Sequence, residues 1–202
     1  MLDTRIRGII DPTMNTMGQW LASRGITPNA VTLAGFGIGC AAAIAIAFHA
    51  YWSGLALLLL SRICDALDGA VARQSGQQSD LGGYLDIVLD FAFYGLIPLA
   101  FVFANPEVNA LAGSVMLLTF YINGASFLAY ALMAEKRGLD EDARGSKSIL
   151  YTTGLAEATE TIVVFVLMCL FPAWFSIIAW IFAAIVAYTT FSRIMLAKHS
   201  FG

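Results

Sequence analysis

Charged residues are scarce in this chain. Asp, Glu, Lys and Arg make up 12% of its 202 residues, whereas hydrophobic residues make up 59%. A water-soluble domain averages about 25% charged residues. So few charges cannot coat a soluble globule of this length, and the composition therefore indicates an integral membrane protein.

Histidine and cysteine are also few, and the net charge is negative. His49 and His199 are too few and too far apart for a histidine metal site. Cys40, Cys64 and Cys169 lie in apolar runs without a C-x-x-C spacing, and we interpret them as small buried hydrophobic residues. The net charge of −3 argues against nucleic acid as a partner.

Residues 1–24 are too polar for a membrane span, and we expect no cleavable signal peptide there because no apolar core of 7–15 residues is present. Their apolar residues recur at helical spacing, which predicts an amphipathic helix lying in the membrane interface. Gly25 and Pro28 are expected to end it. The apolar positions are Ile6, Ile9, Ile10, Met14, Met17, Trp20 and Leu21.

Six apolar stretches follow, each close to the roughly 20 residues that cross a bilayer. Short turn-like separators such as Asn105-Pro106 and Phe171-Pro172 divide them. We therefore predict an all-α bundle of six transmembrane helices that occupies residues 25–202 as one domain. The predicted spans are 30–50, 53–73, 82–104, 110–134, 149–171 and 173–197.

The Lys and Arg residues predict the orientation. All eleven fall in the N-terminal segment, near the second connection, in the fourth connection or at the C-terminus, with Arg62 and Arg73 grouped near the second connection. Under the positive-inside rule, both termini and the even-numbered connections face the cytoplasm. We expect a multi-pass protein of the cytoplasmic membrane, the inner membrane of a bacterium.

Four aspartates lie inside the second and third predicted spans. Asp65 and Asp68 are three residues apart, and Asp86 and Asp90 are four apart, so each pair shares a helix face. An ionised carboxylate at membrane depth costs about 2.5–3.5 kcal/mol. Antiparallel neighbouring spans would bring all four to one cleft near the cytoplasmic side. Either some of them stay protonated or cations neutralise them, and two divalent ions would match four ionised carboxylates.

The neighbouring residues suit a phosphate-bearing ligand, with which Mg²⁺ is commonly shared. Gly69 and Gly82 remove side chains where a diphosphate could approach the backbone, and Ser79 offers a hydroxyl. Arg73 offers a planar fork for phosphate oxygens. The glycines are equally compatible with helix packing, and Arg73 with a topology-setting charge.

The same residues carry a resemblance to a known family. Asp65-Ala-Leu-Asp68-Gly-Ala-Val-Ala-Arg73, eight residues, Gly82, three residues, Asp86, three residues and Asp90 resemble the signature D-x-x-D-G-x-x-A-R…G-x-x-x-D-x-x-x-D of the CDP-alcohol phosphatidyltransferases. Every fixed position is present. Residues 26–32 also resemble the T-P-N-x-x-T entry to that family's first span.

The resemblance implies a fold, a reaction and an assembly. It implies six spans, a homodimer in the cytoplasmic membrane, and transfer of a phosphatidyl group from CDP-diacylglycerol to a small alcohol with release of CMP. It implies two divalent ions, Mg²⁺ or Mn²⁺. A CDP-amino alcohol donor with diacylglycerol as the acceptor remains an alternative.

The resemblance also implies a role for each matching residue. Asp65, Asp68 and Asp86 would be metal ligands, and Asp90 would be the general base that also touches the second metal ion. The residues implied to contact the CDP group are Asn29, Ala30, Val31, Thr32, Asp68, Gly69, Arg73, Ser79 and Gly82.

The acceptor is predicted from the fifth and sixth spans. Glu157 and Glu160 lie three residues apart in an apolar stretch, which favours a pocket that faces an ammonium group or hydroxyls. A structural hydrogen bond, or an ion pair with Arg193 or Arg144, is the alternative. Ala158 stands where relatives that use phosphorylated acceptors tend to carry arginine, which favours a non-phosphorylated alcohol such as an amino alcohol.

Further alternatives stay open. Arg144, Lys147 and Arg193 could instead form an anion site for glycerol 3-phosphate or inositol phosphate, or simply set the topology. A divalent-cation transporter would also place acidic residues in a helix bundle. A transporter would space them along a path, whereas the four aspartates cluster towards one side.

Overall fold

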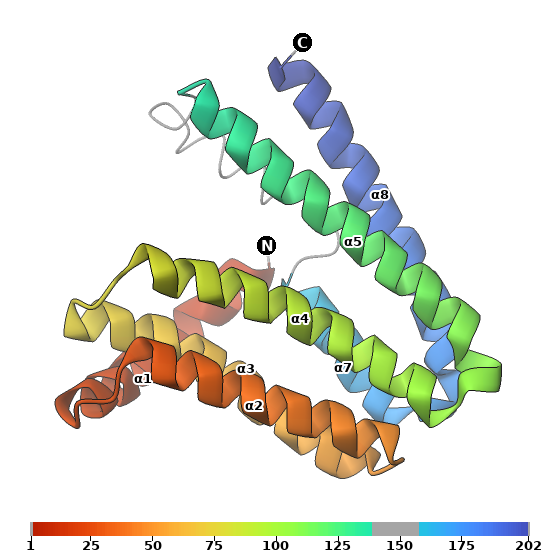
Figure 1. Ribbon diagram of the computed structural model, residues 1–202, viewed down its shortest axis with the longest axis horizontal. Coiled ribbons are helices and arrows are strands. Elements are labelled where there is room, and N and C mark those ends of the chain that lie inside the picture. The colour runs from red at the N-terminus through yellow and green to blue at the C-terminus, as the bar shows by residue number, and fades with distance from the viewer. Residues whose placement is uncertain (1, 139–157, 202) are drawn as a thin grey trace. The chain divides into compact units, whose positions relative to one another are not determined.

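The computed structural model describes residues 2–138 and 158–201, and every element in these ranges is helical (Figure 1). By their internal contacts, the residues divide into two compact units, Leu2–Pro106 and Glu107–Gly202.

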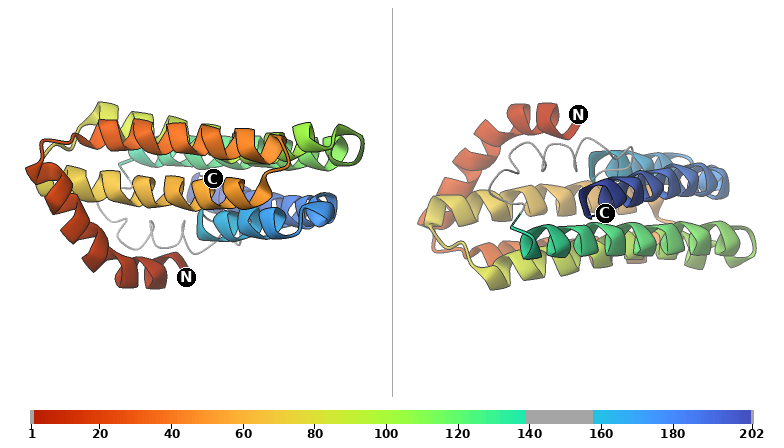
Figure 2. Two further views of the ribbon diagram at one scale, coloured as in Figure 1. Left: turned by 90° about the horizontal axis from the view of Figure 1, so that it is seen from below. Right: turned by 90° about the horizontal axis from the view of Figure 1, so that it is seen from above.

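The N-terminal unit contains four helices. They are α1 (Leu2–Ser23), α2 (Pro28–Ala47), α3 (Tyr51–Ser75) and α4 (Asp80–Ala104). Helix α2 packs against α3 and α4, with α2 and α3 side by side, and α1 packs against α3 (Figure 2).

Local chemistry sets the ends of these helices. Thr27 and Ser79 cap α2 and α4 by accepting hydrogen bonds from backbone N–H groups of the first turn. Gly25 and Gly76 follow α1 and α3 with φ of +76° and +66°, a conformation that glycine adopts without strain.

Small residues let α2 approach its neighbours closely. A Cβ atom added at Gly35 would lie 2.8 Å from Cys64 Cβ, and one at Gly39 would lie 2.8 Å from the Phe93 ring. Glycines four residues apart therefore form the face of α2 that meets α3 and α4, a common arrangement between helices in membranes. Phe93 itself is fully buried.

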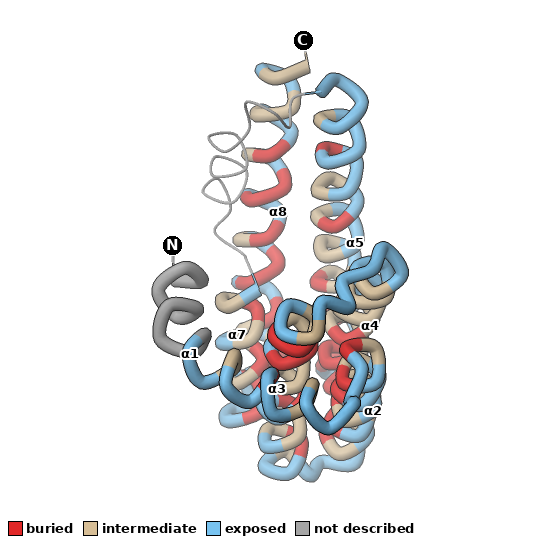
Figure 3. The backbone as a smooth tube through the Cα atoms, turned by 90° about the vertical axis from the view of Figure 1, so that its left-hand side faces the viewer, coloured by how far each residue is buried: buried red, intermediate tan, exposed pale blue. Residues whose placement is uncertain are grey.

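The C-terminal unit contains α5 (Pro106–Lys136), α7 (Ala158–Leu170), the short η1 (Pro172–Trp174) and α8 (Phe175–Phe201). Phe120 of α5 packs against Phe165 of α7 and Phe182 of α8, with ring centroids 6.4 and 6.0 Å apart. The buried residues of α8 recur turn by turn along one face (Figure 3).

Among the described residues, four helical stretches are long and apolar enough to cross a membrane. They are α2, α4, α5 and Pro172–Phe201. Their outer faces carry exposed apolar side chains such as Leu111, which is 69% exposed. Such faces suit lipid, so the chain is an integral membrane protein.

The predicted count of six spans is confirmed only in part. Helix α3 has 25 residues but carries Arg62, Asp65, Asp68 and Arg73, so it falls short of the same apolar standard. Helix α7 has 13 described residues, and residues 149–157 of the predicted fifth span lie outside the described ranges. Helix α1 closely matches the predicted helix 1–24, while its place in the membrane interface stays a prediction.

Candidate functional site

Three of the four aspartates meet between α3 and α4. Asp65 and Asp68 come from α3 and Asp86 from α4, and one carboxylate oxygen of each lies within 4.8 Å of the other two. The helices bring them together because residues 76–79 form a short link that returns the chain antiparallel (Figure 1).

Asp68 shows why this group suits a cation. Its residue is 7% exposed, and its Oδ2 is buried without a hydrogen-bond partner. A buried carboxylate oxygen without a partner is costly unless something binds it. Oxygens on one Mg²⁺ lie at most about 4.2 Å apart, so a small inward movement would complete a site for a hard divalent ion.

Asp90 has a different neighbour. Its Oδ1 accepts a 2.7 Å hydrogen bond from Nη1 of Arg62, and the same nitrogen lies 3.4 Å from Oδ1 of Asp65. Asp90 is therefore joined to the other carboxylates through an arginine, and it is not a member of the group of three.

Arg62 lies inside the predicted span 53–73, deeper than its grouping near the second connection suggests. It lies within α3, 13 residues before the last residue, Ser75, or about 20 Å along the helix axis. Its side chain is only 11% exposed. The sequence feature that could have predicted a place for Arg62 in the site is its position three residues before Asp65, which puts both residues on one helix face.

A cavity of about 250 Å³ is lined by two of the three carboxylates, Asp68 and Asp86. It is close to the lower end of the size range of small-molecule sites. The N-terminal ends of α2 and α4 both border it, and helix N-termini favour anions. Its lining includes Asn29, Thr32, Asp68, Gly69, Gln77, Gln78, Ser79, Gly82 and Asp86.

Most of the residues predicted to contact CDP border this cavity, but three do not. Ala30 and Val31 lie in the first turn of α2 outside the lining, and Val31 is buried in a cluster with Leu67 and Val71. Arg73 also lies outside it, and its Nη2 donates to Asn15 Oδ1 of α1 at 3.5 Å. Sequence reasoning missed the two glutamines of the link, which carry no distinctive spacing.

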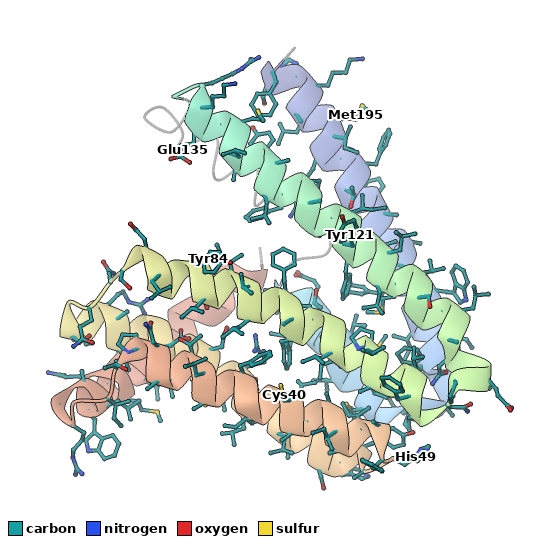
Figure 4. All side chains as sticks on the ribbon, in the orientation of Figure 1. Cys40, His49, Tyr84, Tyr121, Glu135 and Met195 are labelled. Carbon is teal, nitrogen blue, oxygen red and sulfur yellow. The ribbon has the colours of Figure 1, made fainter. Side chains whose placement is uncertain are left out.

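The cavity lies at one end of the N-terminal unit. Tyr84 marks this end on α4, whereas His49 marks the turn at the far end of α2 (Figure 4). The 20 residues of α2 separate the two ends by about 30 Å.

Two of the predicted acceptor residues, Glu160 and Arg193, lie in the described ranges. Glu157, Arg144 and Lys147 lie outside the described ranges. Glu160 lies half-buried in the first turn of α7. Arg193 of α8 is buried, donates to Asn123 Oδ1 at 2.9 Å and lies over the ring of Phe127.

Comparisons with known proteins agree with the motif. The model of one family, CDP-alcohol phosphatidyltransferase, matches residues 25–192. The inner membrane protein YnjF of Escherichia coli (strain K12) is 47% identical over 194 residues, covering 96% of this chain and 94% of that protein. An archaetidylinositol phosphate synthase of Aeropyrum pernix is 32% identical over 145 residues, covering 70% of this chain and 72% of that protein.

Solved structures share the fold. Phosphatidylinositol phosphate synthase of Mycobacterium tuberculosis with CDP-DAG bound aligns with a TM-score of 0.70 at 18% identity, covering 90% of this chain and 92% of that one. The same protein in complex with manganese and citrate aligns with a TM-score of 0.71 at 18% identity, covering 92% and 88%.

Proposed function

This chain belongs to the CDP-alcohol phosphatidyltransferase family, and we propose that it transfers a phosphatidyl group from CDP-diacylglycerol to a small alcohol, releasing CMP. The observation that carries the proposal is the group of three carboxylates beside a cavity bordered by Asn29, Ser79 and Gly82. The complex of the mycobacterial enzyme with CDP-DAG supports this donor.

We assign Asp65, Asp68 and Asp86 as ligands of divalent metal ions, Mg²⁺ or Mn²⁺. The buried, unpartnered Oδ2 of Asp68 and the all-oxygen donor set support this assignment, as does the manganese complex of the mycobacterial enzyme. When bound, two such ions would neutralise the diphosphate and the departing CMP. Asp90 is the proposed fourth carboxylate of this site.

The cavity residues would hold the donor. The N-terminal ends of α2 and α4 offer backbone N–H groups and positive dipole ends to a diphosphate. The Asn29 amide and the Ser79 hydroxyl add polar contacts at the same place, and Gly82 leaves space between them. The acyl chains would stay in the bilayer.

Asp90 would act as the general base. It takes the proton from the acceptor hydroxyl while that oxygen attacks the lipid-side phosphorus in line. The new O–P bond forms as the bond to the CMP oxygen breaks. The reaction therefore requires no covalent enzyme intermediate.

For the acceptor we propose a non-phosphorylated alcohol, because Ala158 stands where arginine would favour a phosphorylated one. The Aeropyrum relative, named an archaetidylinositol phosphate synthase, favours the alternative of inositol phosphate. The buried Arg193 is compatible with that alternative because it is a fixed cation on α8.

The experiment is CMP release by the purified protein in detergent with Mn²⁺ or Mg²⁺ and CDP-diacylglycerol. The acceptors offered are serine, ethanolamine, choline, glycerol, glycerol 3-phosphate and inositol phosphate, and a CDP-amino alcohol with diacylglycerol is run in parallel. Asp86→Ala should abolish both CMP release and Mn²⁺ binding. Full activity of Asp86→Ala would end the proposal, and metal flux in liposomes without CMP release would favour a transporter.

We also propose a cytoplasmic membrane location with both termini in the cytoplasm, and a homodimer as the assembly. The scarcity of charge and the E. coli relative described as an inner membrane protein support the location. Crosslinking of the protein in native membranes tests the dimer.

A further inference from the structure

Arg62 is held by Asp90, Ser61 and Phe93, and its Nη1 also lies 3.4 Å from Oδ1 of Asp65. Its Nη1 donates to Asp90 at 2.7 Å, its Nη2 donates to Ser61 Oγ at 3.3 Å, and its guanidinium carbon lies 3.8 Å from the centre of the Phe93 ring. Ser61 is itself anchored, because its hydroxyl donates to the Gly35 carbonyl at 2.8 Å. The guanidinium is therefore held in one plane.

A buried arginine at this depth in α3 is unusual. Lys and Arg near the ends of spans reach the interface with their long side chains, but Arg62 lies about 20 Å from the end of α3 and only 11% of its side chain is exposed. Buried charges within spans are costly and usually mark function. The family signature begins at Asp65 and assigns nothing to Arg62.

We propose that Arg62 is a positioning residue that fixes Asp90 in the orientation required of a general base, an inference that rests on the proposed transferase function. Arg62 binds Oδ1 of Asp90, so Oδ2 is the oxygen that receives the acceptor's proton. The side chain of Asp90 is 29% exposed, so Arg62 does not cover it completely.

The geometry calls for arginine specifically. A planar guanidinium can donate to Asp90 and Ser61 with different nitrogens while its face lies on Phe93. A lysine ammonium keeps the positive charge, but it cannot lie flat on the ring or present a fork. Arg62→Lys should therefore restore the function only in part.

The effect of Arg62 on Mn²⁺ binding distinguishes a positioning role from a purely structural one. With all four aspartates ionised, they and Arg62 sum to −3, and removal of Arg62 leaves −4. Loss of the arginine should thus leave Mn²⁺ binding as tight or tighter. If Arg62 only supported the fold of the site, its loss would weaken Mn²⁺ binding along with turnover.

The test uses the full chain in detergent and measures kcat, KM for CDP-diacylglycerol, and Mn²⁺ binding without substrate. For Arg62→Gln we expect kcat to fall about 10- to 100-fold, because small misplacements of a reacting group have effects of this size. KM for CDP-diacylglycerol should stay within about 3-fold of the unaltered protein's value, because Arg62 is proposed to act on the reacting group and not on binding of the donor. The kcat of Arg62→Lys should lie between those of Arg62→Gln and the unaltered protein. Arg24→Gln is the control: Arg24 is exposed, follows α1 and lies over the ring of Trp20, and its loss should leave all three measurements unchanged.

Two results overturn the role of Arg62. One is an unchanged kcat in Arg62→Gln, and the other is a joint loss of kcat and Mn²⁺ binding. If Arg62→Gln does not fold, Arg62→Lys decides by the same two measurements, since it keeps the charge. Absence of CMP release from the unaltered protein with every acceptor would overturn the proposed function and this role together, whereas the first two results leave the proposed function intact.

Discussion

The four aspartates of the signature differ in their surroundings. Asp65, Asp68 and Asp86 each place an oxygen around one point, within 4.8 Å of the other two, whereas Asp90 lies outside this group and accepts the 2.7 Å hydrogen bond from Arg62. A cation at that point needs three carboxylates, and a proton acceptor needs one that is not wholly taken up by metal. The surroundings thus support separate roles, with Asp90 as base.

Asp90→Asn tests that separation. The amide cannot take a proton, so CMP release should fall by about 10²- to 10⁴-fold, the usual contribution of a general base. Mn²⁺ binding should remain, because the group of three is untouched. The measurement pairs CMP release with Mn²⁺ titration, and loss of all Mn²⁺ binding would contradict the idea that the group of three holds an ion without Asp90.

Gly82 tests the cavity. A Cβ atom there would lie 3.2 Å from Ser79 Oγ and 3.3 Å from Asn29 Oδ1, between the two side chains proposed to meet the donor. Gly82→Ala should therefore raise KM for CDP-diacylglycerol several-fold. Gly95→Ala, on the same helix with nothing within 4 Å of its added Cβ, is the matched control. Both changes add similar helix propensity, so equal KM values in the two variants would argue against donor binding in this cavity.

At the scale of elements, α1 is joined to the site by its packing on α3. Met14, Leu21 and Ala22 pack against a buried cluster that includes Val71, and Asn15 receives the hydrogen bond from Arg73. Helix α1 is thus part of the packed N-terminal unit, in contact with the helix that carries two of the aspartates.

Gly18 sets how closely α1 approaches. An added Cβ would lie 2.8 Å from Ala70 Cβ and 2.9 Å from the Ala70 backbone carbon, neither of which can move aside easily. Gly18→Ala should destabilise the protein by about 1–3 kcal/mol, as overpacking commonly does. Gly37→Ala, whose added Cβ meets nothing within 4 Å, should not. Thermal unfolding in detergent compares them, and equal midpoints would mean that α1 does not depend on this contact.

The elements that sequence predicts well are those with a local cause. The apolar runs at 30–50, 53–73 and 82–104 fall on α2, α3 and α4, since apolar length decides a membrane helix. The spacing of the aspartates likewise predicted correctly that Asp65, Asp68 and Asp86 lie together.

Features that depend on contacts between helices escaped prediction. The burial of Arg62 depends on Asp90 and Phe93 of α4, about 30 positions away, which local spacing cannot reveal. The CDP contact of Arg73 stays a prediction, whereas its contact with Asn15 of α1 could not be foreseen from spacing. Both cases concern long side chains, whose direction is set by tertiary packing.

At the scale of the whole molecule, the two ends of the N-terminal unit differ in positive charge. Arg24 and Arg73 lie at the end that carries the cavity, whereas the turn at residues 48–50 has neither Lys nor Arg. The positive-inside rule then predicts that the cavity faces the cytoplasm. A CMP-releasing site is expected on that side, because cytidine nucleotides are soluble, charged and unable to cross the bilayer unaided.

Single-cysteine labelling in intact cells tests this orientation. In a background without the native cysteines, His49→Cys should react with a membrane-impermeant maleimide added outside, because His49 is exposed at the turn far from the cavity. Gln78→Cys, equally exposed but on the link beside the cavity, should react only after the cells are opened. The two positions lie at opposite ends of membrane-crossing helices, so each serves as the control for the other. A reversed pattern would place the carboxylates on the outer side, where cytidine nucleotides are not supplied, and transfer from a CDP-linked lipid would then lose its physical basis.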